Sequence, residues 1–180
     1  YMVEGNGLWR ACWAQGAAET SIPRAAWAVT LAGGSFTWQD WPQCGYTTAA
    51  SEMFTWPSAN PMVDRLDVLY NIMTRDVAFH RLTPANNLLS SCWSNFDRWG
   101  AVPTSPCYAA AEPGRQYVVY KEDGGSFGLN VAAGNYTATW VDTRSGNRQP
   151  ANGGTVQGGA TATFSAPSTT SDWVLLLTAG

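Results

Sequence analysis

The sequence predicts an α/β unit followed by an antiparallel β-sandwich. Residues before about 105 show helical periodicity separated by long loops, whereas the residues after it form short alternating runs bounded by turns. A chain of 180 residues allows one domain or two small ones. We therefore expect the α/β portion at residues 1–88, a connector at 89–105 and the sandwich at 106–180.

The α/β unit opens with a strand that ends on a carboxylate. Tyr1–Val3 is a short apolar run, and Glu4 and a glycine follow it. A helix is expected over Ser21–Leu31, because a polar cap precedes Pro23 and a pair of glycines ends the helical pattern. Gly34–Trp38 is then a second strand-like run.

A second helix follows a loop rich in Trp, Pro and Gly. Asn60 is a natural helix cap, and Pro61 suits the first helical position. Apolar residues recur beyond it at helical spacing as far as Arg75, which predicts one buried face. That face consists of Met62, Leu66, Leu69 and Met73.

The second half contains six candidate strands. They are short, they are separated by Asp, Gly, Ser and Asn turn signals, and several alternate apolar with polar residues. Short strands at this spacing are typical of an antiparallel sandwich. The candidates are Cys107–Ala111, Gln116–Lys121, Ser126–Val131, Tyr136–Asp142, Ala160–Ser165 and Trp173–Thr178.

The composition excludes some functions and favours another. The net charge is −3 and there is no basic stripe, so nucleic acid is not an expected partner. No apolar run is long enough to cross a bilayer, which argues against a membrane role. Ten Trp with only 13% charged residues favours a secreted, polysaccharide-active protein, although any single Trp is as readily explained as core. The lack of an initiating Met and of a signal peptide predicts a processed or truncated N-terminus.

Four cysteines predict two disulfides and an oxidising, extracellular compartment. No CxxC pair occurs and His80 is the only histidine, so zinc-ligand spacing is absent and we expect no metal or cofactor. Four cysteines allow three pairings. One choice would tie two neighbouring loops and close a short loop before the sandwich, with the pairs Cys12–Cys44 and Cys92–Cys107.

The order of these pieces resembles a known family. It is similar to the end of an apiosidase-like (β/α)8 glycoside hydrolase, followed by the small β-sandwich that is often named for collagen binding. No single piece is diagnostic, and the order of the pieces carries the resemblance. The matching stretches are Glu4, Arg24–Trp38 and Leu82–Pro84 in the first part, and Gln116–Tyr120, Tyr136–Gly146 and Asp172–Leu177 in the second.

The resemblance implies that the first part is the last two βα units of a TIM-type barrel. Tyr1–Val3 would be its seventh strand and Gly34–Trp38 its eighth. A complete barrel needs roughly 250 residues, so this chain would be the C-terminal portion of a larger enzyme. A companion chain that supplies the rest of the barrel, or self-association, would then cover the exposed strand edges and apolar helix faces.

The same resemblance implies a secreted retaining glycoside hydrolase that acts on plant or microbial polysaccharide. Such enzymes use two carboxylates roughly 5 Å apart. The family keeps its nucleophile at the end of the seventh strand, which corresponds to Glu4, and the acid/base would lie on the missing portion. The competing interpretation of Glu4 is a solvated side chain near a chain end.

Aromatic and polar residues that follow the two strands are candidate substrate contacts. Trp38 and Trp41 follow the second strand, where a flat indole can stack on the apolar face of a sugar ring, and Gln39 can hydrogen-bond sugar hydroxyls. Trp9 and Trp13 lie in the loop after the first strand and would line the same cleft. Packing beneath the loops is the alternative role for each Trp.

A non-catalytic function is the alternative for the whole chain, as a carbohydrate-binding or accessory β-sandwich protein. The sandwich contains no obvious catalytic set. Its aromatic residues could form a glycan-binding platform, although strand alternation predicts that at least Trp140 is in the core. The platform candidates are Tyr117, Tyr120, Trp140 and Trp173.

Overall fold

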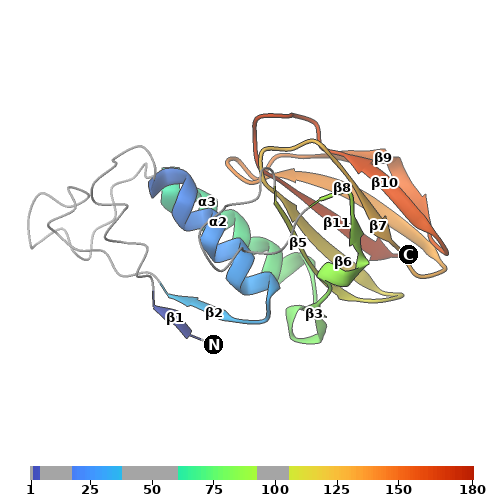
Figure 1. The fold of residues 1–180 in the computed structure, drawn as a ribbon, viewed down its shortest axis with the longest axis horizontal. Helices are drawn as coiled ribbons and strands as arrows, with labels where there is room; N and C mark the ends of the chain where they lie inside the picture. Colours follow the sequence, from blue (N-terminus) through green and yellow to red (C-terminus); the bar gives the residue numbers. More distant parts are fainter. Residues whose placement is uncertain (1, 5–17, 38–60, 93–105) are drawn as a thin grey trace, which may run out of the picture.

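The computed structural model describes residues 2–4, 18–37, 61–92 and 106–180. Two helices lie side by side against one face of a β-sandwich, and a short parallel strand pair lies beside them (Figure 1). The helices are α2, Ala18–Leu31, and α3, Pro61–Asn71, which continues into a π-helical turn at Ile72–Asp76. The parallel pair joins β1, Met2–Glu4, to β2, Ser35–Thr37.

The sandwich consists of a six-stranded and a three-stranded sheet, and all of its strand pairs are antiparallel. The larger sheet has the order β3-β5-β6-β11-β8-β9 and the smaller one the order β10-β7-β4. The strands of the larger sheet are β3 Thr83–Pro84, β5 Cys107–Glu112, β6 Gln116–Lys121, β11 Trp173–Ala179, β8 Asn135–Asp142 and β9 Arg148–Gln157. The strands of the smaller sheet are β10 Thr161–Ser165, β7 Ser126–Asn130 and β4 Leu89–Ser90.

The larger sheet is buried on both faces. Alternate residues of a strand point to opposite faces, and in β6 Val119 belongs to the core between the sheets while Val118 belongs to the core beneath the helices. In β11, Leu175 and Leu176 divide in the same way. This double burial explains why these strands are continuous apolar runs rather than half-polar ones.

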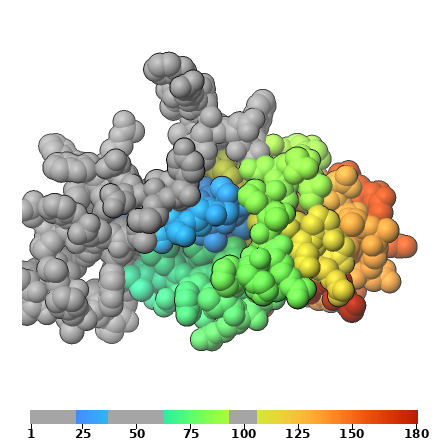
Figure 2. All heavy atoms as spheres, turned by 90° about the horizontal axis from the view of Figure 1, so that it is seen from below, coloured from blue at the N-terminus to red at the C-terminus, as the bar shows by residue number. Residues whose placement is uncertain are grey.

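The helices form a third layer that covers the larger sheet. Ala26, Trp27 and Leu31 of α2 are buried against it, and Trp27 stacks on Tyr120 of β6 with ring centroids 5.3 Å apart and planes inclined by 6°. Leu69 of α3 belongs to the same buried cluster. The space-filling view shows the helical segments lying directly against the strands (Figure 2).

The prediction of a barrel remnant is wrong. In the described part of the chain the strands are mainly antiparallel, the parallel β1–β2 pair is three residues long on each side, and no ring of βα units is present. The helical patterns were read correctly. Their apolar faces cover an antiparallel sandwich sheet, and periodicity alone does not reveal which sheet a helix covers.

The predicted apolar faces are largely covered within the chain. Ile22, Leu69 and Met73, which were expected to need a companion chain or a second copy, are 8% exposed each. Val29 and Leu66 are partly buried. A companion chain and self-association therefore stay predictions that the burial of these residues does not require.

The sandwich prediction agrees with the structure for the six candidate strands, apart from shifts at their ends. Strand β9 was missed because it contains Pro150 and a Gly153–Gly154 pair and is mostly exposed, as is typical of an edge strand. Strands β3 and β4 were also missed. They have two residues each and precede residue 106, but they join the sandwich sheets.

Removal of the stacked indole of Trp27 should weaken the packing of the helical layer on the larger sheet. We expect Trp27→Ala to lower the free energy of unfolding by about 3–5 kcal/mol, because it empties a fully buried site. Tyr70→Ala is the control: Tyr70 is 63% exposed, so its loss should be within about 0.5 kcal/mol. Urea denaturation measures both changes, and equal effects would contradict the packing described for Trp27.

Candidate functional site

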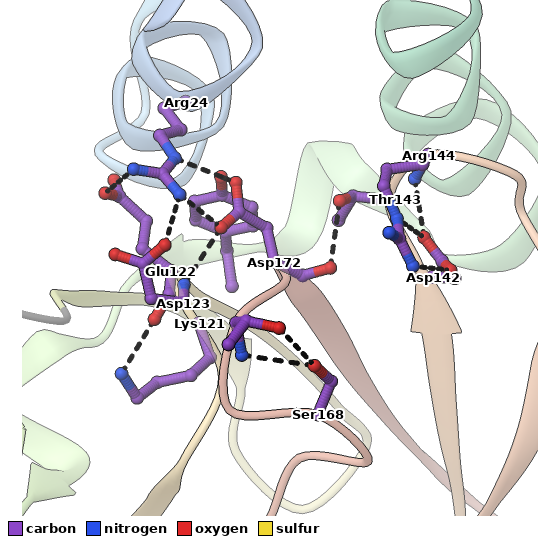
Figure 3. Close-up of polar contacts among 11 residues, drawn as sticks. Arg24, Lys121, Glu122, Asp123, Asp142, Thr143, Arg144, Ser168 and Asp172 are labelled. Carbon is purple, nitrogen blue, oxygen red and sulfur yellow. Dashed lines mark hydrogen bonds and ion pairs between the residues drawn. The ribbon is translucent and has the colours of Figure 1, made fainter. Parts of the chain in front are cut away.

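Within the described residues, a cluster of charged side chains lies where α2 meets the end of β6 and the start of β11 (Figure 3). Arg24 projects from α2 and forms a two-pronged contact with Asp172, with Nε 2.9 Å from Oδ2 and Nη2 2.7 Å from Oδ1. Its Nη2 also donates to Asp123 at 2.6 Å, and its Nη1 lies 3.5 Å from Glu122. We call Arg24, Glu122, Asp123, Asp172 and Tyr120 the Arg24 cluster.

A tight turn after β6 positions two of these carboxylates. Asp123 and Gly124 have φ of 53° and 63°, and a Cβ at Gly124 would lie 1.6 Å from the carbonyl oxygen of Ser168. Only glycine permits this approach. The turn therefore lies against the segment that leads to Asp172, and the Asp123 backbone N–H donates to the Asp172 carboxylate at 2.9 Å.

Asp172 is a buried carboxylate with well-defined donors. Burial raises its pKa, but hydrogen bonds from Arg24 and from the Asp123 backbone, with the charge of Arg24 and a hydrogen bond from Tyr120, outweigh burial and lower the pKa below its ordinary value. The Tyr120 hydroxyl donates to it at 2.8 Å. Burial, and then the charge of Asp172, raise the pKa of Tyr120. Asp172 is therefore held as an anion.

Glu122 has the opposite shift. Burial raises its pKa to about 7, and the charges of Asp172 and Asp123 add to this effect, while Arg24 opposes it. Three carboxylates thus surround one guanidinium, and the Lys121 ammonium donates to the Glu122 carbonyl at 3.0 Å. Burial first, and the neighbouring carboxylates second, favour a proton on Glu122 near neutral pH.

Two carboxylates with pKa values pushed apart are also typical of acid–base catalysis. Here Asp172 already accepts from Arg24, Tyr120 and a backbone N–H, and neither Asp172 nor Glu122 lines either of the cavities described below. Structural ion networks perturb pKa values in the same way. The geometry is that of a structural ion-pair network that joins α2 to the sandwich.

A second ion pair lies in the turn between β8 and β9. Arg144 donates through Nε and Nη2 to Asp142 at 3.0 and 2.7 Å. Burial raises the pKa of Asp142, but the hydrogen bonds from Arg144 outweigh it and lower the pKa. Thr143 between them donates its hydroxyl to the Asp172 carbonyl at 2.9 Å, which connects this turn to the Arg24 cluster (Figure 3).

Two cavities that are lined by described residues border the helical layer. The first, which we call the α3 groove, lies between α3 and the β8–β9 turn and has a volume of about 460 Å³. Its walls include Asp64, Asp67 and Asn71 on α3 and Arg144 and Arg148 on the sandwich. The second lies at the C-terminal end of α2, has a volume of about 300 Å³, and is lined in part by the exposed Phe79 and by His80.

The sequence-predicted site residues fall almost entirely outside the described part of the chain. Glu4 is the last residue of β1 and is paired with Thr37 of β2. Its predicted role as nucleophile stays a prediction, as do the predicted substrate contacts. The residues that lie outside the described ranges are Trp9, Trp13, Trp38, Gln39 and Trp41, with the disulfide candidates Cys12 and Cys44.

The Cys92–Cys107 disulfide is confirmed, with the two Cα atoms 6.0 Å apart. It joins the segment after β4 of the smaller sheet to the first residue of β5 of the larger sheet. The proposed aromatic platform is wrong, because its four side chains are at most 8% exposed and fill the two cores. They are Tyr117, Tyr120, Trp140 and Trp173.

The Arg24 cluster was missed by sequence reasoning. Its members are separated by up to 148 residues along the chain. The available signal was local: Arg24 lies beside Pro23 in a helix with an apolar face, and charged residues directly border the apolar runs Tyr117–Tyr120 and Trp173–Leu177. A charge in such a position needs a partner, although the sequence does not indicate which one.

In the described ranges, a metal site would be marked by a group of ligand side chains, and a membrane span by the length and hydropathy of a helix. No group of three or more His, Cys, Asp and Glu side chains there could hold a metal ion. The helices α2 and α3, like every other helix in those ranges, are too short or too polar to cross a membrane.

One family model is similar in sequence to most of the sandwich. Residues 103–178 match the model of the family described as "Putative collagen-binding domain of a collagenase". That match covers the sandwich from β5 to Thr178 in β11, and thus less than half of the chain. No curated protein matches the chain in sequence.

Solved structures share the fold over nearly the whole chain. One is a protein described as a glycoside hydrolase, with a TM-score of 0.67 and 15% identity, covering 90% of this chain and 37% of that one. Another is a family 5 glycoside hydrolase from Bacteroides vulgatus ATCC 8482, with a TM-score of 0.66, 15% identity and coverage of 89% and 36%. At this identity the likeness concerns the fold alone, and the chain spans little more than a third of either structure.

The raised pKa of Glu122 predicts that stability falls as the pH rises. The folded pKa of about 7 exceeds the ordinary value of 4.5, so the unfolded chain releases this proton more readily. Glu122 thus costs stability progressively between pH 4.5 and 7. Asp172 acts oppositely: its contribution is present above its ordinary pKa of 3.8 and is lost as the pH falls through its lowered folded pKa.

We expect Glu122→Gln to flatten the pH profile of the free energy of unfolding between pH 4.5 and 7. Urea denaturation at several pH values measures this profile. Glu112→Gln is the matched control, because Glu112 lies on β5 away from the cluster, where it accepts from Gln116 at 3.1 Å and lies 3.6 Å from Arg81. A profile as steep in Glu122→Gln as in the parent would show that Glu122 does not hold the proton.

Proposed function

We propose that the sandwich is a non-catalytic accessory domain of a carbohydrate-active protein, and that it holds the helical layer in place. The observation that carries this proposal is the cover of the larger sheet: α2 and α3 share one buried cluster with β5, β6 and β11. A sheet face that is occupied by the chain's own helices is not available to a ligand. The role of the sandwich is then to stabilise the helical layer that packs on this face.

Two further findings support the accessory role. The large hydrophobic side chains that are exposed in the described residues, Tyr70 and Phe79, belong to the helical layer and not to the sandwich strands. The solved glycoside hydrolases overlap this chain across both layers, which is consistent with a unit that is used within carbohydrate-active enzymes. The Cys92–Cys107 disulfide supports secretion, because disulfides persist in oxidising compartments.

The Arg24 cluster provides the test. We expect Arg24→Met to lower the free energy of unfolding by roughly 2–4 kcal/mol, between the values for exposed and fully buried pairs, because it leaves three carboxylates without their shared cation. In the parent protein, Trp fluorescence and far-ultraviolet circular dichroism should report a single coincident transition, since the helices and the sandwich share a core.

The control for this variant is Arg81→Met, because the Arg81 side chain is 60% exposed and its contact with Glu112 is 3.6 Å long. Its effect should stay below about 1 kcal/mol. Two separate transitions in the parent protein, or equal losses in the two variants, would refute the accessory role.

A catalytic role of Glu4 is the second candidate, and one observation favours it. Glu4 ends β1, which pairs in parallel with β2, and the carboxyl ends of parallel strands are where ligands of α/β sheets bind. The solved structures that cover 90% and 89% of this chain are described as glycoside hydrolases. We propose that Glu4 acts as a nucleophile in a retaining glycoside hydrolase of which this chain is one portion.

Glu4→Gln, introduced into the gene and studied in the protein that its natural source produces, should lower the rate of polysaccharide hydrolysis by orders of magnitude. The melting temperature should not change. The carboxylate is required for attack on the anomeric carbon. Glu19→Gln, at the start of α2, serves as the control and should retain activity. Retained hydrolysis in Glu4→Gln would end this candidacy while leaving the accessory role of the sandwich intact.

A further inference from the structure

The α3 groove has the chemistry of a saccharide site. We infer that it binds a neutral oligosaccharide between α3 and the β8–β9 turn. The inference goes beyond the proposed accessory role and rests on it only for the carbohydrate setting. The groove volume of about 460 Å³ lies within the range of roughly 300–1,000 Å³ that small-ligand pockets occupy.

The two walls of the groove offer complementary hydrogen-bonding groups. Asp64 and Asp67 on α3 only accept hydrogen bonds when ionised, whereas Arg144 and Arg148 on the sandwich only donate. A sugar hydroxyl both donates and accepts. Vicinal hydroxyls of a ring placed between the walls can therefore donate to one side and accept from the other, and Asn71, with both functions, extends the α3 wall.

The donor wall is organised before any ligand arrives. Arg144 is fixed on Asp142 through Nε and Nη2, and Arg148 donates through Nη2 to Asp76. A guanidinium carries five N–H donors, so these contacts orient each group without using all of its donors. Fixing the side chains in advance lowers the entropy cost of binding.

The β8–β9 turn holds this wall against α3. The Gly146 N–H donates to the Asp142 carbonyl at 2.8 Å, and the Asp142 N–H donates to the Asn147 carbonyl at 2.9 Å. Gly146 has a φ of 72°, and a Cβ built on it would lie 3.6 Å from a Val68 methyl of α3. The turn thus rests on the helix, so the spacing between the two walls is set by packing.

The floor of the groove suits the carbon face of a sugar ring. Val68, Ile72 and Val141 line it. Val68 is partly exposed, whereas Ile72 and Val141, each 1% exposed, lie beneath the surface and support it. A pyranose ring presents C–H groups on its faces and hydroxyls at its rim. An apolar floor with polar walls matches that distribution, because small-ligand sites combine apolar lining with a few placed polar groups.

The charge of the groove indicates a neutral ligand. Two carboxylates and two guanidinium groups line the groove, and each guanidinium group is already paired with a further carboxylate behind the wall. A lining without net positive charge does not attract uronates or sulfated sugars. The carboxylates are Asp64, Asp67, Asp76 and Asp142.

The test is a titration of the full chain with neutral oligosaccharides of glucose, xylose, mannose and galactose, followed by isothermal calorimetry and by amide NMR shifts. The variant Asp64→Ala/Asp67→Ala removes the acceptors of the α3 wall, and alanine keeps the helix because it is the best helix former. We expect at least one neutral oligosaccharide to bind the parent protein, with shifts at Ser145 and Asn71, and the variant to bind it at least tenfold more weakly.

Two controls make the result specific. Glu112→Gln removes a carboxylate outside the groove and should bind like the parent, and oligogalacturonate should bind more weakly than the neutral sugars. Absence of binding by all neutral oligosaccharides, tighter binding of oligogalacturonate, or equal affinity of the Asp64→Ala/Asp67→Ala variant would each overturn the inference. The proposed accessory role is tested separately, because Arg24→Met changes unfolding and the groove variant should not.

Discussion

The larger sheet needs an apolar cover on both faces, and the remaining architecture follows from that need. Its central strands β6 and β11 carry large apolar side chains on both sides, so a two-layer sandwich would leave one face in water at a cost of about 25 cal/mol for each Å² of apolar surface. The helices α2 and α3 supply the missing cover. Because they lie there, Trp27 meets Tyr120, Arg24 meets Asp172, and the α3 groove forms between α3 and the β8–β9 turn.

Apolar burial does not determine how α2 is oriented on the sheet, and the Arg24 cluster supplies that directional constraint. Hydrophobic contact is non-directional, whereas a planar guanidinium that meets a carboxylate through two N–H groups permits a narrow range of positions. The desolvation of these charges offsets much of their attraction. Arg24 and Asp172 therefore specify the docking geometry more than they add to the net stability, which comes from the shared core.

Much of the sandwich could be predicted from local sequence, because turn chemistry and apolar runs mark β6, β8 and β11. The Cys92–Cys107 pair could be proposed because both residues flank one short loop. The barrel remnant was wrong because the periodicity of α2 and α3 reports a buried face but not the sheet that buries it. Strand β9 lacks an apolar run, and the Arg24 cluster and the α3 groove join residues that are remote in sequence. A local sequence pattern does not show which residues from distant parts of the chain contact one another.

The order of strands has a consequence for the way the chain is made. Strand β11, residues 173–179, lies between β6 and β8 near the middle of the larger sheet. The ribosome synthesises β11 after all the other strands of that sheet. Strands β6 and β8 therefore each have an unpaired edge until β11 emerges. Until then the sheet is two separate pieces with exposed backbone N–H and C=O groups. The interval between the synthesis of β8 and the insertion of β11 is therefore when the nascent chain is most open to aggregation and has most need of a chaperone.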